Sequence, residues 1–455
     1  MRMLLLGMLF FCISCNKKNL LDVGSPSGVI VSPIVYKSDA NAADVLTGLY
    51  YIMSSGGPAT GELSCTYYGS LSADEFTLSD QDELAQSAYK NALTSANVPL
   101  WTQFYNYIFH ANAAIEGLSN STALTLSVKQ QLMGEAKFIR GLCYFYLVNF
   151  FGKVPLVVST DYKVNKGLSC ADMDAVYIQI ATDLEAAQTL LSDQYLEANV
   201  TTLTSERLRP TRWAAIALLA RVQLFRRNWA AAITAAKTVI DHTSLFDIAP
   251  LNEVFLKNSK EAIWQLQPVN GKYTEDGQLF ISSLPVYISP SLLQAFEPHD
   301  LRKSSWLKSN SREGNPCYPF KYKTSREAKT ITEYLMVLRI TEQYLIRAEA
   351  FVQLGDLAGA RADLNVIRHR AGLANTTAST SAELLAAIMH ERQVEFFAEW
   401  GHRWLDLKRT GTVDAVMERM TTQKGGSWKT YLQLYPIPQS DLLLNTHLKQ
   451  NVGYE

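Results

Sequence analysis

The chain has 455 residues, of which 47% are hydrophobic and 19% are charged, the composition of an ordinary folded protein. Its formal net charge of -1 gives no electrostatic reason to expect a nucleic-acid partner. The six cysteines show no zinc-type spacing, so no zinc site is expected. The four cysteines beyond the first fifteen residues are expected to be mostly free or buried.

The first fifteen residues, MRMLLLGMLFFCISC, have the pattern of a bacterial export signal. Arg2 precedes an apolar run that is too short to span a bilayer and that ends in small residues and a cysteine. Ile13-Ser14-Cys15 resembles a lipobox, in which the cysteine is acylated and the chain is cut just before it. We therefore expect a signal peptide at residues 1–14 and lipidation of Cys15, with a plain secretion signal as the alternative. Two or three acyl chains on one residue would give a stable membrane anchor.

Apolar residues recur at helical spacing in pairs of segments along the rest of the chain. The most regular pair lies within residues 335–370, where Gly355 marks a tight turn between two amphipathic helices. A similar pair lies at residues 211–241, and Ala220 matches Ala348 when the two are aligned. Small residues let paired helices approach closely, as in tetratricopeptide hairpins, which stack because one hairpin cannot bury its apolar face alone. We predict a mainly α-helical array of about four tetratricopeptide-like hairpins, near residues 39–118, 127–191, 211–241 and 335–370.

Two long segments, residues 55–100 and 243–333, hold no helical period for long. The first is loop-rich and interrupts the first hairpin. The second is rich in proline, and its stretches EAIWQLQPV and LFISSLPVYIS have strand-like composition, which predicts minor β-structure. Long irregular segments inside a compact protein are usually functional, so we expect the ligand-binding face in these two insertions.

The most specific motifs lie in the C-terminal part of the chain. A helix expected at about residues 381–398 leads into EWGHRWLDLKR, and PIPQ followed by QNVGY lies near the C-terminus. Together with GEAKFIRGLCYFYLVNFFGKVPLV at residues 134–157, these segments resemble the signatures of SusD/RagB proteins. The resemblance extends over essentially the whole chain after the signal peptide.

That resemblance implies a single SusD-like domain over residues 15–455, lipid-anchored in the outer membrane and exposed at the cell surface. It implies non-catalytic binding of a glycan or oligosaccharide and delivery to a SusC-like TonB-dependent transporter. RagB-like members of the family are associated with peptides, so a peptide ligand is an alternative, and a secreted glycoside hydrolase is a third hypothesis. No cofactor is expected.

No catalytic or metal site is expected either. HERQV begins like the zinc-protease motif HExxH but lacks its second histidine. Glu391, Glu395 and Glu399 recur every four residues and would line one helix face, whereas a glycosidase needs two carboxylates across a cleft. Because Arg392 and Arg403 lie nearby, we expect these residues to form ion pairs that hold helices together.

Sugar binding needs exposed aromatic planes and polar side chains that satisfy hydroxyl groups. The two insertions supply such residue types, and Trp101 starts a helix beside the first of them. Packing in the core is the alternative interpretation for each aromatic residue. Asn270 and Arg312 are further polar candidates. The candidate ligand-binding residues are Tyr67, Tyr68, Asp74, Trp101, Tyr273, Tyr287, Trp306 and Tyr318.

Overall fold

The computed structural model describes residues 34–310 and 316–455. The predicted signal peptide, the predicted lipidation site Cys15 and the candidate Arg312 therefore lie outside the described residues. Within the two described ranges, no helix is both long enough and apolar enough to cross a bilayer.

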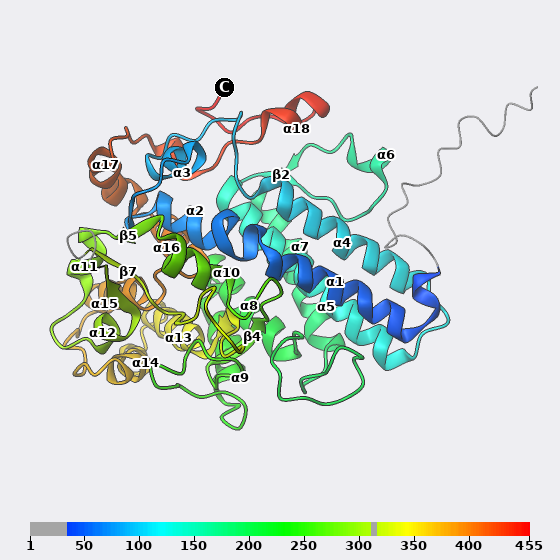
Figure 1. The fold of residues 1–455 in the computed structure, drawn as a ribbon, viewed down its shortest axis with the longest axis horizontal. Helices are drawn as coiled ribbons and strands as arrows, with labels where there is room; N and C mark the ends of the chain where they lie inside the picture. The colour runs from blue at the N-terminus through cyan, green and yellow to red at the C-terminus, as the bar shows by residue number, and fades with distance from the viewer. Residues whose placement is uncertain (1–33, 311–315) are drawn as a thin grey trace, which may run out of the picture.

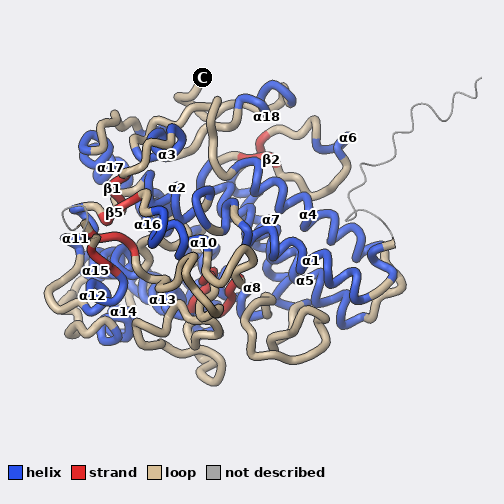
Figure 2. Tube along the Cα trace, in the orientation of Figure 1, coloured by secondary structure: helices blue, strands red, loops and turns tan. Residues whose placement is uncertain are grey.

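Long helices packed side by side form most of the molecule, so the predicted mainly helical fold is confirmed (Figures 1 and 2). From α4 onward each of these helices packs on the next one along the chain, and α9 packs on α13 across the irregular segment between them. The helices of the array are α1 Asp39–Ser55, α4 Trp101–Asn120, α5 Leu126–Phe151, α7 Met173–Leu190, α8 Arg212–Phe225, α9 Trp229–Ile240, α13 Ile340–Gln353, α14 Leu357–Arg370 and α15 Ser381–Glu395.

Small side chains set the spacing where the hairpins cross. The pairs predicted at residues 211–241 and 335–370 occur as α8–α9 and α13–α14. Ala220 of α8, Ala232 of α9 and Ala350 of α13 belong to one buried cluster. Alanine at these points lets three helices pack closely, which joins the two hairpins into one array.

The first predicted hairpin, near residues 39–118, packs differently from the expectation. Helix α4 lies mainly against α5, and α1 lies against both of them. The physical reason is aromatic packing: Trp101 and Phe104 of α4 contact Phe151 and Tyr146 of α5, with ring centroids 4.9 and 5.9 Å apart.

The β-structure is minor, as the composition predicted. Among the described residues it consists of four antiparallel two-stranded sheets, and in Figure 2 the strands are short red segments among helices. EAIWQLQPV contains a strand, and so does the second half of LFISSLPVYIS, at Val286–Ile288. Its first half, LFISS, instead lies in a helical turn, Gln278–Ser283, that ends at Leu284 in the left-handed region. The pairs are β1 Phe76–Leu78 with β5 Val286–Ile288, β2 Val154–Pro155 with β3 Cys170–Ala171, β4 Ala262–Leu266 with β8 Leu335–Arg339, and β6 Leu307–Ser309 with β7 Cys317–Pro319.

The first insertion contains a buried helix, α2 Cys65–Ser72, where the sequence predicted loops. The hydroxyl of Ser64 accepts a hydrogen bond from the backbone N–H of Tyr67 and so caps the helix. Helix α2 packs on α16 His402–Arg409, and a Cβ on Gly69 would lie 2.6 Å from the Cα of Gly401. Glycine is therefore required on both sides of this crossing.

Short helices and one large core complete the fold. Trp264 and Trp404 are among the largest fully buried side chains. Cys65 and Cys143 are free and buried, and Cys170 and Cys317 are free and half-buried, in agreement with the sequence prediction. The remaining helices are α3 Glu83–Tyr89, α6 Tyr162–Asn165, α10 Glu275–Gly277, α11 Pro290–Ala295, α12 Leu301–Trp306, α17 Val413–Gln423 and α18 Gln439–Leu444.

Candidate functional site

Most aromatic residues predicted to meet a ligand are in the core instead. Trp306 is 0% exposed, its ring packs edge-on against Phe255, and its indole N–H donates to the carbonyl of Leu251. Trp101 is also buried, and its indole N–H donates to the carboxylate of Asp441 at 3.2 Å. The expectation of exposed rings at these two positions is wrong, because internal partners satisfy both indoles and burial removes their apolar area from water.

The tyrosines of the first insertion are buried as well. Tyr67 and Tyr68 lie on α2 rather than on a loop, with their rings edge-to-face at 5.5 Å. Burial, with smaller contributions from nearby acidic groups, raises the pKa of both phenols. The expectation of a loop aromatic that stacks on a sugar is therefore wrong for this pair.

Asp74 is a structural residue rather than an open polar contact. It is 2% exposed, and both its carboxylate oxygens accept hydrogen bonds from Arg403, at 2.8 and 2.9 Å. Burial alone would raise the pKa of Asp74, but the Arg403 guanidinium outweighs it and holds the pKa below its usual value. The carboxylate is thus occupied inside the protein, which corrects the prediction that it is free to bind a ligand.

The remaining candidates lie on or near the second insertion. Tyr287 on β5 and Tyr318 on β7 are buried, and the side-chain amide of Asn310 donates to the Tyr287 hydroxyl at 3.1 Å. Tyr273 is half-buried and Asn270 is exposed. Of the predicted aromatic residues, only Tyr273 therefore keeps substantial access to solvent within the described parts of the chain.

The glutamates after His390 form ion pairs, as predicted, but with other partners than expected. Glu391 pairs with Arg302 at 2.6 Å, and Glu395 pairs with Arg339 at 2.6 Å. Glu399 lies beyond the end of α15, so it does not share the helix face, and it also pairs with Arg339.

Burial alone would raise the pKa of Glu395, but the guanidinium groups of Arg370, Arg339 and Arg302 hold it well below its usual value. A carboxylate fixed in this ionised, fully paired state is unsuited to donate a proton to a substrate. This arrangement gives the acidic cluster a structural role.

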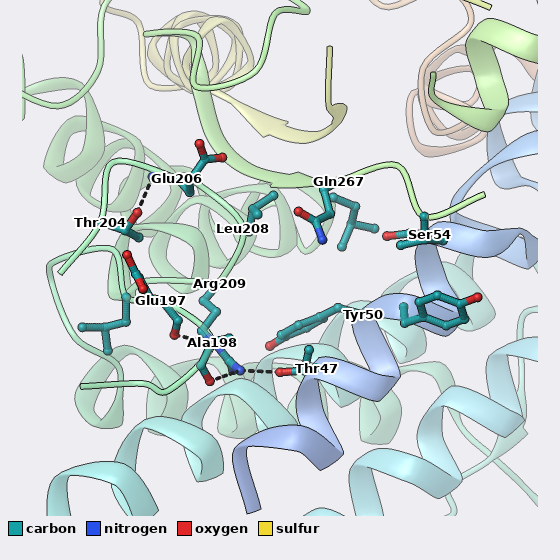
Figure 3. Close-up of a pocket in the computed structure, with 14 residues that line it drawn as sticks. Thr47, Tyr50, Ser54, Glu197, Ala198, Thr204, Glu206, Leu208, Arg209 and Gln267 are labelled. Atoms are coloured by element: carbon teal, nitrogen blue, oxygen red, sulfur yellow. Dashed lines mark hydrogen bonds between the residues drawn. The ribbon is translucent and has the colours of Figure 1, made fainter. Parts of the chain in front are cut away.

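A cleft of about 330 Å³ opens between α1 and two loops, one before α8 and one after β4 (Figure 3). On the α1 side it is lined by Tyr50 and Tyr51, and Gln267 lies on the loop after β4. The Tyr51 ring is 54% exposed, and Gln267 is exposed too. An aromatic ring and a free amide around a concavity of this size are what a small polar ligand with apolar faces requires.

Arg209 makes the floor of this cleft rigid. Its guanidinium donates to the hydroxyl of Thr47 at 2.6 Å and to the carbonyl of Ala198 at 2.9 Å (Figure 3). It also donates to Glu135 at 2.7 Å. The Tyr50 hydroxyl also donates to Glu135, at 2.7 Å. These bonds join α1, α5 and the loop before α8, so the cleft walls are held in place before any ligand arrives.

Neither Tyr50 nor Tyr51 was among the candidates predicted from the sequence. A pair of consecutive tyrosines in a helix gives no reliable signal for a cleft, since Tyr67 and Tyr68 of α2 are consecutive and both buried. The contribution of the loop at residues 196–209 carried no signal either, because it depends on how the loop returns to α1.

Two family models match this chain. Residues 20–224 match a model described as "Starch-binding associating with outer membrane", and residues 306–454 match the SusD family model. Together the two matches cover well over half of the chain.

Individual relatives agree with these models. SusD-like protein P25 of Formosa agariphila is 22% identical and is matched over 98% of each chain. The starch-binding protein SusD of Bacteroides thetaiotaomicron is 36% identical over a shorter region, 26% of this chain and 21% of its own.

A solved structure named "Laminarin binding SusD-like protein" superposes with a TM-score of 0.77 at 23% identity, over 92% of this chain and 100% of that one. It supports the fold. The family models and relatives lead to the conclusion that the chain belongs to the SusD/RagB family of non-catalytic, outer-membrane-associated carbohydrate-binding proteins.

Proposed function

We propose that this protein binds a glycan in the cleft beside α1 and delivers it to a SusC-like TonB-dependent transporter. The observation that carries the proposal is the pre-organised cleft with its exposed Tyr51 ring, in a chain whose family includes members named for starch and laminarin. The C–H face of a sugar ring packs on an aromatic plane, and the Gln267 amide can both donate to and accept from sugar hydroxyls.

The cleft holds its ligand without reacting with it. Arg209 and Glu135 satisfy each other, so neither is available as an acid or base for bond cleavage. The rigid floor lowers the entropic cost of binding, because few side chains must be ordered when a sugar enters. Capture followed by release to a transporter is the function that such a site serves.

Affinity electrophoresis of the purified protein on a polysaccharide panel tests the binding. We expect at least one polysaccharide to retard the wild-type protein and Tyr51→Ala to weaken that binding by roughly tenfold, the contribution of one stacked aromatic ring. Tyr162→Ala is the matched control, since Tyr162 is 68% exposed on α6 and does not line the cleft. Retention by peptides but not by any polysaccharide, or release of sugar products, would contradict the proposal.

The membrane anchor and the transporter are tested separately. Cys15→Ser in the full-length chain should move the protein from the membrane fraction to the soluble fraction, because the acyl chains would be lost. The wild-type protein, solubilised in mild detergent, should co-purify with a TonB-dependent transporter. A Cys15→Ser protein that stays with the membranes would show that lipidation is not what holds it there.

A further inference from the structure

The charges around the cleft beside α1 are unbalanced. Three charged residues line it: Glu197, Glu206 and Arg209. Arg209 is buried and pairs at 2.7 Å with Glu135, which is itself fully buried. Because that cation and that anion cancel, the net charge of the lining comes from the two glutamates.

Neither glutamate is neutralised by a nearby cation. Glu197 is exposed. Glu206 is half-buried, and its partners are neutral: the amide of Asn258 donates to it at 3.0 Å, and the Tyr334 side chain also hydrogen-bonds it. The second carboxylate oxygen of Glu206 is buried. In the described ranges no ion pair includes either one. In Figure 3 both residues lie at the end of the cleft formed by the loop before α8.

The nearest basic residues in the sequence do not correct this imbalance. Arg207 directs its guanidinium into the interior, where the carbonyls of Ala262 and Leu245 accept its hydrogen bonds. Lys272, on the loop after β4, and Glu275, the first residue of α10, carry opposite charges. The cleft therefore carries the negative charge of two carboxylates, of which only Glu197 is exposed, and no unpaired guanidinium.

We infer that this cleft selects uncharged glycans and rejects glycans that carry uronate or sulfate groups. The inference rests on the proposed function. Hydroxyl groups of a neutral sugar can donate to the exposed carboxylate of Glu197, and hydrogen bonds to a charged acceptor are the stronger kind. A uronate or sulfate at the same place would meet two like charges within one Debye length, about 8 Å at physiological salt.

A matched pair of ligands tests the charge preference directly. One is the neutral polysaccharide that gives the strongest retardation, and the other is the same polysaccharide partly oxidised at C6 to uronate. We expect the wild-type protein to bind the neutral form about tenfold more tightly in 50 mM NaCl, and the difference to shrink in 500 mM NaCl as the charges are screened.

The protein variant Glu197→Gln/Glu206→Gln supplies the second comparison. It should reduce the ratio of the affinities for the neutral and the oxidised ligand about fivefold, because two partly screened like charges are removed. Its affinity for the neutral form should stay within about twofold, since an amide oxygen still accepts a hydrogen bond. Glu185→Gln/Glu418→Gln removes two exposed charges from α7 and α17 and should leave the difference unchanged.

The outcomes separate this inference from the proposed function. Equal or tighter binding of the oxidised form, or an unchanged difference in the double variant of the cleft, overturns the charge preference while glycan binding stands. Failure of every polysaccharide to bind overturns the proposed function, and the charge preference with it.

Discussion

At the scale of single residues, two neighbouring carboxylates illustrate how burial and pairing compete. Asp74 and Glu75 are both buried, but only Asp74 has an arginine partner, Arg403. Burial raises the pKa of Glu75 to about 7, more than the neighbouring Ser70 hydroxyl and the nearby cations lower it. The folded protein therefore holds the Glu75 proton more tightly than the unfolded chain does.

The sign of the consequence follows from linkage. With a folded pKa of about 7 and a reference value of 4.5, the contribution of Glu75 to stability is fully present below pH 4.5 and is lost as pH rises through 7. Glu75→Gln removes this dependence. We expect the variant to exceed the wild type in free energy of unfolding by roughly 2–3 kcal/mol at pH 8, and to differ little at pH 4.5.

Urea denaturation of both proteins at pH 4.5 and pH 8 measures that difference. Glu83→Gln, at an exposed position on α3, is the control and should give the same free energy as the wild type at both values. If Glu75→Gln has the same effect at pH 4.5 as at pH 8, Glu75 does not titrate in this range.

The residue scale is also where prediction from the sequence failed most. The sequence identified the right residue types for sugar binding, but Tyr67, Trp101 and Trp306 are core residues. Irregular segments rich in proline contribute to the core as helices do, and no periodic pattern tells which of their faces is covered. Tyr51 and the charges of Glu197 and Glu206 were missed because the cleft that they line depends on how a loop returns to α1.

At the scale of elements, the glycine of the motif EWGHRW explains why α2 and α16 approach each other so closely where they cross. Gly401 adopts a φ of +68° and precedes α16, and its Cα lies against Gly69 of α2. Helix α2 was not predicted because all eight of its residues are buried, so its apolar and small residues show no one-sided pattern. Helices α9 and α14 were predictable because each has an exposed face opposite a buried one. Helix α8 is buried along almost its whole length, and its prediction depended on the match of Ala220 to Ala348.

A pair of glycine substitutions tests this crossing. Gly69→Ala would place a Cβ 2.6 Å from the Cα of Gly401, a backbone atom that cannot move aside cheaply. We expect a loss of about 2 kcal/mol or more in the free energy of unfolding, the cost of overpacking. Gly48→Ala, in the middle of α1 with open space around its Cβ, should instead stabilise the protein by about 0.5–1 kcal/mol.

Thermal denaturation of the two variants is a sufficient measurement, since their expected shifts have opposite signs. A Gly69→Ala protein as stable as the wild type would mean that α2 and α16 separate readily. Equal destabilisation by both substitutions would mean that the loss at Gly69 is not specific to the contact with Gly401, because helix propensity favours alanine over glycine at both positions.

At the scale of the whole molecule, buried ion pairs join segments that are far apart in the sequence. Arg221 of α8 pairs with Glu342 of α13 at 2.6 Å, and this pair ties the two tetratricopeptide-like hairpins together. Arg403 of α16 pairs with Asp74, which lies two residues before the start of β1. The sequence predicted that the charged residues of the C-terminal motif are structural. It did not predict their partners, because these lie far away in the sequence.

Arg403 offers the clearest test of this long-range coupling. Arg403→Met would leave Asp74 buried without its main partner, with a weak contact of 3.5 Å from the Gln393 amide, a backbone hydrogen bond and the charge of Lys424 nearby. We expect a loss of about 3–5 kcal/mol in the free energy of unfolding, since breaking a buried pair leaves an uncompensated charge. Asp74→Asn/Arg403→Met should regain part of that loss because no buried charge remains, and Arg326→Met, at an exposed position, should change little.

Hydrogen exchange shows whether the effect is local or extends through the molecule. If the Arg403–Asp74 pair couples these two parts of the chain, Arg403→Met should lower amide protection in α2 and in α16 by the same free energy. The reason is that opening either helix breaks the contact between α2 and α16. Loss of protection in α16 alone would contradict this coupling.

Lowering the pH should reproduce, in the wild-type protein, the loss of stability expected for Arg403→Met. Since the folded pKa of Asp74 lies below its unfolded value, the stability that it contributes is present above the unfolded pKa and is lost as pH falls through the folded one.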